Sequence, residues 1–435
     1  MVKRVVTSIM VSCFLVLGVT ALAFGWSLEE AAKPYAGATI RFITETTPPS
    51  YWVEEALPEF EKATGIKVIV ERQAHPHLEE KALMDFAAGT GIYDVFNFDY
   101  SWTGKYVKAG YIEPFDKYIN DPKLADPNND LKDFYPRMWE GTSWDGVPYG
   151  YPFDSVIEYL FWNKAIFDKY GVAGPPKTPD EWMDAMAKLN HPPELYGTGM
   201  QAKRHLSIVC EWLNVLWAFD GDLYDENYNV LLTNENAIKA TEFYKKMAEY
   251  APPGVTTWTW DDVNTALQQG IVAQTIQWDE NYGSMEDPEE SKVVGQMRYA
   301  PVPTARADGK PVSHYGGSSL GIPVSSKNKE AAFLFIQWAT SYDVQLRGVG
   351  KGSSPTRRSI YQIPELRAKY PSFEATDAAA ETTFWRPRIP EWDDMVEVLA
   401  LELNSVVAGA KDVKEALATS AAKIEEILVK GGYKK

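Results

Sequence analysis

Cysteine is almost absent from this chain of 435 residues, which contains only two. Cys13 lies inside an apolar run near the N-terminus and does not follow a small residue at its end, so it lacks the position of a lipid-anchored cysteine. Cys210 is then alone, and a single cysteine cannot form a disulfide within the chain. We therefore expect the fold to be stabilised by its hydrophobic core and not by disulfides.

Long apolar runs are confined to the first residues. Lys3 and Arg4 are followed by an apolar stretch from Val5 to Val19 and by Ala21-Leu22-Ala23, an order typical of a secretory signal peptide. No later segment offers the roughly 20 uncharged apolar residues that cross a bilayer as a helix. The sequence thus predicts a signal peptide at 1–23 and a periplasmic mature protein.

Basic residues are outnumbered by acidic ones, 43 against 60, which gives a net charge of −17. Loss of Lys3 and Arg4 with the signal peptide makes it about −19. Such a surface repels phosphate backbones and anionic lipids, so we predict no nucleic-acid partner. Aromatic residues are plentiful instead, with 15 Trp and 24 Tyr. Most of these pack in cores, but the surplus suits a site for flat, partly apolar ligands.

Histidine is also rare, with five in the chain, and this argues against familiar catalytic sites. Residues 317–321 match the G-x-S-x-G pattern of serine hydrolases, but no histidine follows Ser319 as that chain order requires. His75 and His77 flank a proline, which is poor geometry for a shared metal ion. We predict no metal, cofactor or catalytic residue, although a pair of glycosidase carboxylates stays open because sequence does not fix their separation.

A possible calcium loop is also weak. Asp126, Asn128 and Asp130 begin like such a loop, but Leu131 stands where a glycine is needed. We interpret these residues as an ordinary surface loop.

The length and the hydrophobic pattern predict two α/β domains. At roughly 100–200 residues per domain, the chain holds about two. A strand at 38–44, a helix at 51–64 and a strand at 66–70 form a βαβ opening, and another strand is predicted at 93–98. The stretch 146–172 has proline and glycine turns, a run of β-formers and a short helix. We interpret it as a strand that carries the chain from one domain into the other.

Several phrases in this order resemble the extracellular solute-binding proteins of ABC importers, the maltose-binding protein group. They are FEKATGIKVIVE, GIYDVFNFD, KAGYIEPFD, GVPYGYPFD and HYGGSSLGIP, and the resemblance extends from about Thr39 to Leu428. It implies an α/β fold of the type II periplasmic binding protein class, in which about three crossing strands form a hinge between two lobes.

The resemblance also implies a division of the chain. Lobe 1 would comprise 27–152 and 259–314, whereas lobe 2 would comprise 153–258 and then 315–435 with the C-terminal helices. The crossings would lie near 151–155, 257–262 and 313–318.

The implied function is capture of a sugar, oligosaccharide or sugar alcohol by a monomer, and delivery to a membrane-embedded ABC permease. Indole and phenol rings suit the C–H faces of a sugar, and charged side chains suit its hydroxyls. The candidate ligand-binding residues follow strands or lie near crossings: Glu45, Thr46, Asp99, Tyr100, Trp102, Asp154, Trp217, Trp278, Asp279, Gly316, Gly317, Ser318, Arg357, Trp385 and Arg386. Two alternatives stay open: a periplasmic carbohydrate-active enzyme, and a binding protein for a polyamine or another small polar solute.

Overall fold

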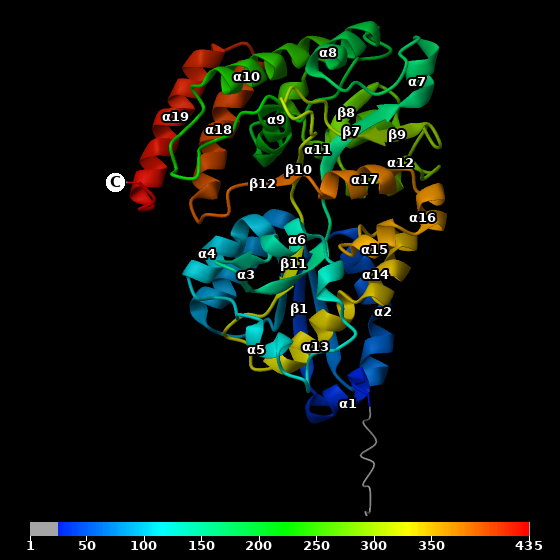
Figure 1. Cartoon of the computed structure of the whole chain (residues 1–435), viewed down its shortest axis with the longest axis vertical. Helices are drawn as coiled ribbons and strands as arrows, with labels where there is room; N and C mark the ends of the chain where they lie inside the picture. Colours follow the sequence, from blue (N-terminus) through cyan, green and yellow to red (C-terminus); the bar gives the residue numbers. More distant parts are fainter. Residues whose placement is uncertain (1–24, 435) are drawn as a thin grey trace, which may run out of the picture.

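The computed structural model describes residues 25–434, which form two lobes of helices and strands (Figure 1). The predicted signal peptide lies outside the described residues. No helix within 25–434 is long and apolar enough to cross a membrane.

Each lobe is built on its own sheet. In the sheet of lobe 1 the strands lie in the order β2 (Lys67–Gln73), β1 (Thr39–Glu45), β3 (Val95–Asp99), β11 (Ser318–Gly321) and β6 (Gly150–Asp154). Strand β1 pairs in parallel with β2 and β3, and β11 is antiparallel to β3 and β6. In lobe 2, β7 (Glu158–Asn163) lies between β8 (Gln274–Trp278) and β9 (Met297–Ala300), and both pairings are antiparallel.

Two short strand pairs complete the β-structure. They are β4 (Ser143–Trp144) with β5 (Val147–Pro148), and β10 (Ser313–Tyr315) with β12 (Thr383–Trp385).

The predicted βαβ opening of lobe 1 is present. Helix α2 (Pro48–Thr64) has a proline in its first turn and ends at Gly65, whose φ of 70° is the left-handed conformation that glycine adopts at a helix C-terminus. Val53, Leu57 and Phe60 are buried on one face of α2, against the sheet core. The other helices of this lobe are α1 (Leu28–Ala32), α3 (His75–Ala88), α4 (Thr103–Lys108), α5 (Asp116–Ile119), α6 (Pro136–Gly141), α13 (Lys329–Ala339), α14 (Tyr342–Gly348) and α15 (Arg358–Tyr361).

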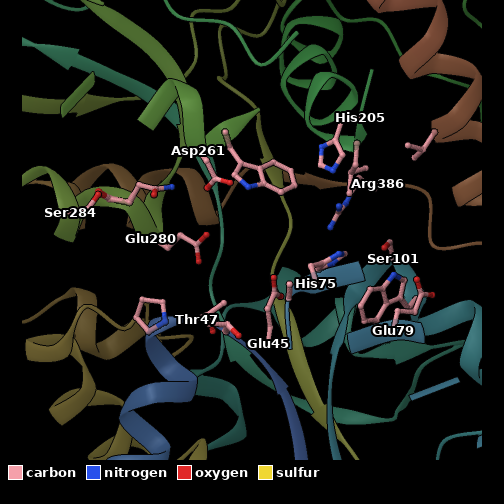
Figure 2. Close-up of a pocket in the computed structure, with 18 of the residues that line it drawn as sticks. Glu45, Thr47, His75, Glu79, Ser101, His205, Asp261, Glu280, Ser284 and Arg386 are labelled. Carbon is pink, nitrogen blue, oxygen red and sulfur yellow. The ribbon is translucent and has the colours of Figure 1, made fainter. Parts of the chain in front are cut away.

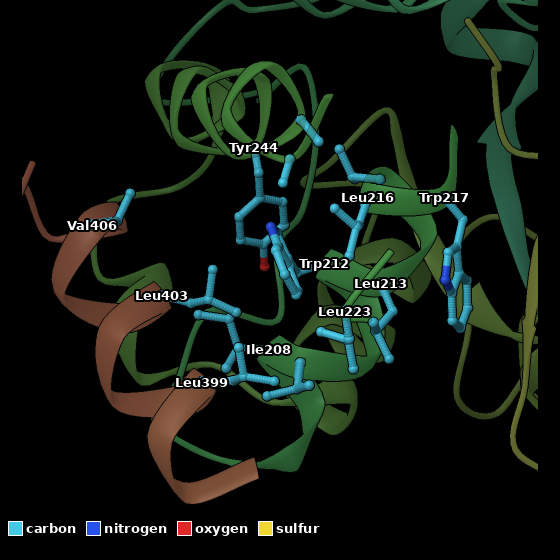
Figure 3. Close-up of a cluster of buried hydrophobic side chains, with 14 of the residues drawn as sticks. Ile208, Trp212, Leu213, Leu216, Trp217, Leu223, Tyr244, Leu399, Leu403 and Val406 are labelled. Carbon is cyan, nitrogen blue, oxygen red and sulfur yellow. The ribbon is translucent and has the colours of Figure 1, made fainter. Parts of the chain in front are cut away.

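The core of lobe 2 is centred on helix α9 (Leu206–Ala218), which is almost wholly buried although it includes Glu211 and Asn214. Trp212 and Leu213 pack within a cluster that includes Tyr244 of α10 (Glu235–Met247) and Leu399 of α18 (Trp392–Val407), as Figure 3 shows. The remaining helices are α7 (Lys164–Lys169), α8 (Pro179–Lys188), α11 (Trp260–Gln268), α12 (Tyr282–Met285), α16 (Pro364–Lys369), α17 (Ser372–Ala380) and α19 (Val413–Lys430).

The chain passes between the lobes three times. It crosses at 155–157 between β6 and β7, at 316–317 between β10 and β11, and through the helical segment from α15 to α17. The first two crossings lie side by side, since Gly316 N donates to Val156 O at 2.8 Å. The third crossing is not an extended strand.

The expected division of the later chain is therefore wrong. Segment 259–314 belongs to lobe 2, because all five residues of β8 are buried and pair with β7. Segment 315–361 belongs largely to lobe 1, because β11 fills the position between β3 and β6. There is no crossing at 257–262, where the chain stays in lobe 2 and enters α11.

Candidate binding site

Two connected hollows lie between the lobes. The outer cleft, of about 1050 Å³, receives Glu45, His75 and Trp102 from lobe 1 and His205, Trp260 and Glu280 from lobe 2. Figure 2 shows labelled side chains of both lobes facing this space. A smaller inner cavity, of about 110 Å³, reaches the two extended crossings at Val156 and Gly316. Glu45, His75, Trp260, Glu280 and Arg386 line both hollows, so the two are continuous.

The strand ends supply the polar lining of the inner cavity. Glu45, Asp99 and Asp154 are the last residues of β1, β3 and β6. In lobe 2, β8 ends at Trp278, and Glu280 follows two residues later. The site thus lies beyond the ends of strands from both lobes, where open α/β sheets present their loops.

One buried ion pair joins the lobes at the cavity. The carboxylate of Asp99 contacts the guanidinium of Arg386, which follows β12 in lobe 2. Asp99 also accepts hydrogen bonds from Ser101 N and Oγ at 2.7 and 2.8 Å, and its Oδ2 lies 3.3 Å from His75 Nε2. Burial alone would raise the pKa of Asp99, but Arg386 and His75 hold it well below its usual range.

Three further carboxyl groups at the cavity have raised pKa values, in contrast to Asp99. Burial, together with repulsion from nearby carboxylates that include Glu45, raises the pKa of Asp154 well above its usual value and that of Glu280 to about 7. Burial also raises the pKa of Glu45, against the effect of nearby His75. Burial disfavours the charged form of His75, but Glu45 and Asp99 reverse this and raise its pKa.

Indole rings provide the apolar surface. Trp278 is 7% exposed and lies 5.1 Å from the ring of His314. That histidine contacts Glu158 at 2.9 Å, and Glu158 accepts a 2.7 Å hydrogen bond from Asn214. This buried network holds His314, on which Trp278 packs. A side chain at Gly316 would meet the Trp278 ring at 2.7 Å, so glycine allows the crossing to approach the indole.

The structure brings nine of the sequence-predicted residues to the two hollows. Asp99, Asp154, Trp278, Gly316 and Ser318 line the inner cavity, Thr46 and Trp102 line the outer cleft, and Glu45 and Arg386 line both.

The other six predicted residues line neither hollow. Trp217 packs in the core of lobe 2 against Phe384, and Trp385 lies between the guanidinium groups of Arg137 and Arg388. Arg357 is 1% exposed and donates to the carbonyl oxygens of Thr340 and Asp130.

Tyr100, Asp279 and Gly317 stabilise the crossings. Tyr100 accepts a hydrogen bond from Tyr315 at 3.0 Å, Asp279 accepts one from Ile157 N at 3.0 Å, and Gly317 O accepts one from Tyr100 N at 3.2 Å.

Several lining residues were missed: Thr47, His75, Leu206, Cys210, Trp260 and Glu280. Glu280 had a signal, because it directly follows the predicted Trp278-Asp279 pair. Trp260 was hidden by its assignment to the wrong lobe. His75 was weighed only as a metal ligand, and the described part of the chain contains no group of three or more side chains placed to hold a metal ion.

Comparisons with known proteins give one consistent result. A family model described as "Bacterial extracellular solute-binding protein" matches residues 44–346. A probable amino-acid ABC transporter periplasmic-binding protein of Sinorhizobium fredii is 28% identical, over 96% of this chain and 98% of its own length. An erythritol/L-threitol-binding protein of Mycolicibacterium smegmatis is 25% identical, over 75% of this chain and 72% of its own length.

Solved structures agree with the sequence comparisons. An ABC transporter solute-binding protein of Agrobacterium radiobacter, solved in complex with ribitol, superposes with a TM-score of 0.81 at 26% identity. It covers 90% of this chain, which covers 99% of that protein.

Proposed function

Because the chain belongs to the bacterial extracellular solute-binding protein family, we propose that it captures a sugar or sugar alcohol between its lobes and delivers it to an ABC permease. The family match confirms the resemblance carried by the sequence, and the solved structures confirm the α/β fold of the type II periplasmic binding proteins. The family consists of extracellular transport proteins. That this chain is exported by residues 1–23 and acts as a monomer without nucleic acid is part of the proposal.

The observation that carries the proposal is the lining of the inner cavity. Two indoles, Trp260 and Trp278, face the same space as several carboxylates and the Arg386 guanidinium. Sugars and polyols have apolar C–H faces that pack on indoles, and hydroxyl edges that bind charged groups through short, strong hydrogen bonds. The relatives named for erythritol and ribitol support a small polyhydroxylated solute.

The size of the inner cavity favours a small solute. Its volume of about 110 Å³ is below the roughly 300–1,000 Å³ common for drug-sized ligands. A monosaccharide or sugar alcohol would occupy this cavity and extend toward the outer cleft. Its contacts would come from lobe 1 through Glu45, Asp99 and Asp154, and from lobe 2 through Trp278 and Arg386, with Ser318 and Gly316 beside the crossings.

We also propose that the chain does not transform its ligand. The relatives and structural neighbours are transport binding proteins. Sugar cleavage or oxidation during incubation would revive the enzyme alternative.

A thermal-shift screen of the mature protein tests the proposal. The compounds are sugars, sugar alcohols, polyamines and amino acids, the last because one relative is named for them. A ligand at about 100 times its Kd adds about 2.7 kcal/mol of stability. We expect a sugar or sugar alcohol to raise the melting temperature of the wild type, and to raise it less in Trp278→Ala. Stabilisation by amino acids or polyamines alone would contradict the proposal.

A further inference from the structure

We infer that the solute carries a protonated amino group, as an amino sugar or an amino alcohol does, and that this group lies against Asp154 and Glu280. The inference rests on the proposed function and specifies the chemical class of the solute.

The inner cavity is lined by more acidic groups than basic ones. Four carboxyl groups line it, those of Glu45, Asp99, Asp154 and Glu280, against the guanidinium of Arg386 and the imidazole of His75. Both basic groups are engaged with Asp99. Within residues 25–434, no ion pair involves the other three carboxylates. A ligand that brings a positive charge would compensate them.

Asp154 shows most directly what is lacking. Its side chain is 2% exposed and lines the inner cavity, and its Oδ1 has no hydrogen-bond partner among the described residues. A buried acceptor without a donor costs free energy that a bound donor can recover. A hydroxyl would supply one hydrogen bond, whereas an ammonium group has three N–H donors and a positive charge that would stabilise the ionised carboxylate. The geometry therefore favours the ammonium group.

Glu280 faces the same cavity from the opposite lobe. It follows β8, whereas Asp154 ends β6 of lobe 1. Figure 2 shows the Glu280 carboxylate directed toward the space above Thr47 and Glu45. An ammonium group between Asp154 and Glu280 would bind both lobes, and would therefore favour the closed arrangement.

The indoles fit the same ligand. Trp260 and Trp278 both line the inner cavity, and a cation over an indole face is attracted by the ring quadrupole. The competing explanation is that Asp154 and Glu280 bind a neutral hydroxyl while protonated. The raised pKa values of both groups favour the protonated state in the ligand-free protein, and a bound ammonium group would lower them again, so the ligand itself must decide.

Matched ligands provide the test. Calorimetry at pH 6 compares 1-amino-1-deoxy-D-glucitol with D-glucitol, D-glucosamine with D-glucose, and D-galactosamine with D-galactose. N-acetyl-D-glucosamine serves as the neutral control. A hydrogen bond to a charged group contributes more free energy than one between neutral groups, and the difference corresponds to about a tenfold change in Kd. We expect at least one amine to bind about tenfold more tightly than its hydroxyl partner and than the N-acetyl compound.

Two variants, one in each lobe, locate the amine. Asp154→Asn and Glu280→Gln should each reduce the ratio of amine to hydroxyl affinity severalfold, and thermal unfolding curves check that each is folded. Asp168→Asn, which alters an exposed carboxylate paired with Lys164 at 2.6 Å, is the control and should keep the ratio.

The possible outcomes distinguish a failure of the proposed amino group from a failure of the proposed sugar or sugar-alcohol binding. Hydroxyl compounds that bind as well as the amines overturn this inference and leave the proposed function standing. If no member of the panel binds, this inference falls, and the thermal-shift screen decides the proposed function separately. An amine preference that persists in both variants would refute the assignment to Asp154 and Glu280.

Discussion

Removal of the Arg386 guanidinium should destabilise the protein through Asp99. The two side chains are 5% and 6% exposed and form an ion pair between the lobes. Breaking a buried pair by removing one partner costs about 3–5 kcal/mol, because the other charge is left buried. Asp99 would keep its hydrogen bonds from Ser101 and its contact with His75. We therefore expect Arg386→Met to lower the free energy of unfolding by about 3 kcal/mol at pH 7.

The loss should depend on pH in a defined direction. In the wild type the folded-state pKa of Asp99 is depressed, so its contribution to stability is present above about pH 4 and is lost as pH falls through the folded pKa. Without Arg386 the largest influence that lowers the pKa of Asp99 is gone, and we expect burial to raise this pKa. Its ionisation then destabilises the variant as pH rises. The deficit of Arg386→Met should accordingly be largest at pH 7 and smaller near pH 4.5.

Urea titrations followed by circular dichroism at both pH values measure this deficit. The control is Arg347→Met, which breaks a 2.8 Å pair with Glu59 in which the side chains are 35% and 55% exposed. An exposed pair contributes at most about 1 kcal/mol. A double-mutant cycle with Asp99→Asn should show positive coupling. A deficit below about 1 kcal/mol, or an equal deficit at both pH values, would refute the reasoning.

Three further predictions concern other parts of the molecule. Trp278→Ala should weaken ligand binding by about 2 kcal/mol in calorimetry, whereas Trp338→Phe, which alters a half-buried side chain packed against the core of lobe 1, should leave the affinity unchanged. Gly317→Ala should cost about 1–3 kcal/mol in urea unfolding, because its Cβ would lie 2.5 Å from a backbone oxygen; Gly350→Ala, with no atom within 4 Å, should not. Burial raises the pKa of Glu211 to about 7, so its stabilising effect is lost as pH rises through 7. Between pH 5 and pH 8, the free energy of unfolding of Glu211→Gln should therefore rise by on the order of 2 kcal/mol relative to that of the wild type. A difference in unfolding free energy that is the same at both pH values would contradict this.

Local sequence signals predicted the first lobe well. The βαβ opening depends on short-range features, a proline at the start of α2, a glycine at its end and an apolar face between them. Residues at strand ends, such as Asp99, Asp154 and Trp278, could be selected because open sheets present their ligands there.

The later chain could not be assigned in the same way. The buried strands β8 and β11 are short, and neither sequence indicates which sheet the strand joins. The sheet is determined by the partner strands, which are β7 for β8, and β3 and β6 for β11. The same limit applies to aromatic residues. Trp217 and Trp278 both lie near the end of a buried element, yet one packs in a core and the other faces the cavity. Pairing across the lobes, as between Asp99 and Arg386, leaves no local pattern.

A solute held by both lobes should close them. Ligand contacts from both sides favour the closed state, and three connections permit bending without free rotation. Small-angle scattering of the mature protein, with and without a saturating concentration of the best sugar, sugar alcohol or amine from the screens, measures this directly. We expect a smaller radius of gyration with ligand. An identical radius in both states, with binding verified by calorimetry, would contradict it.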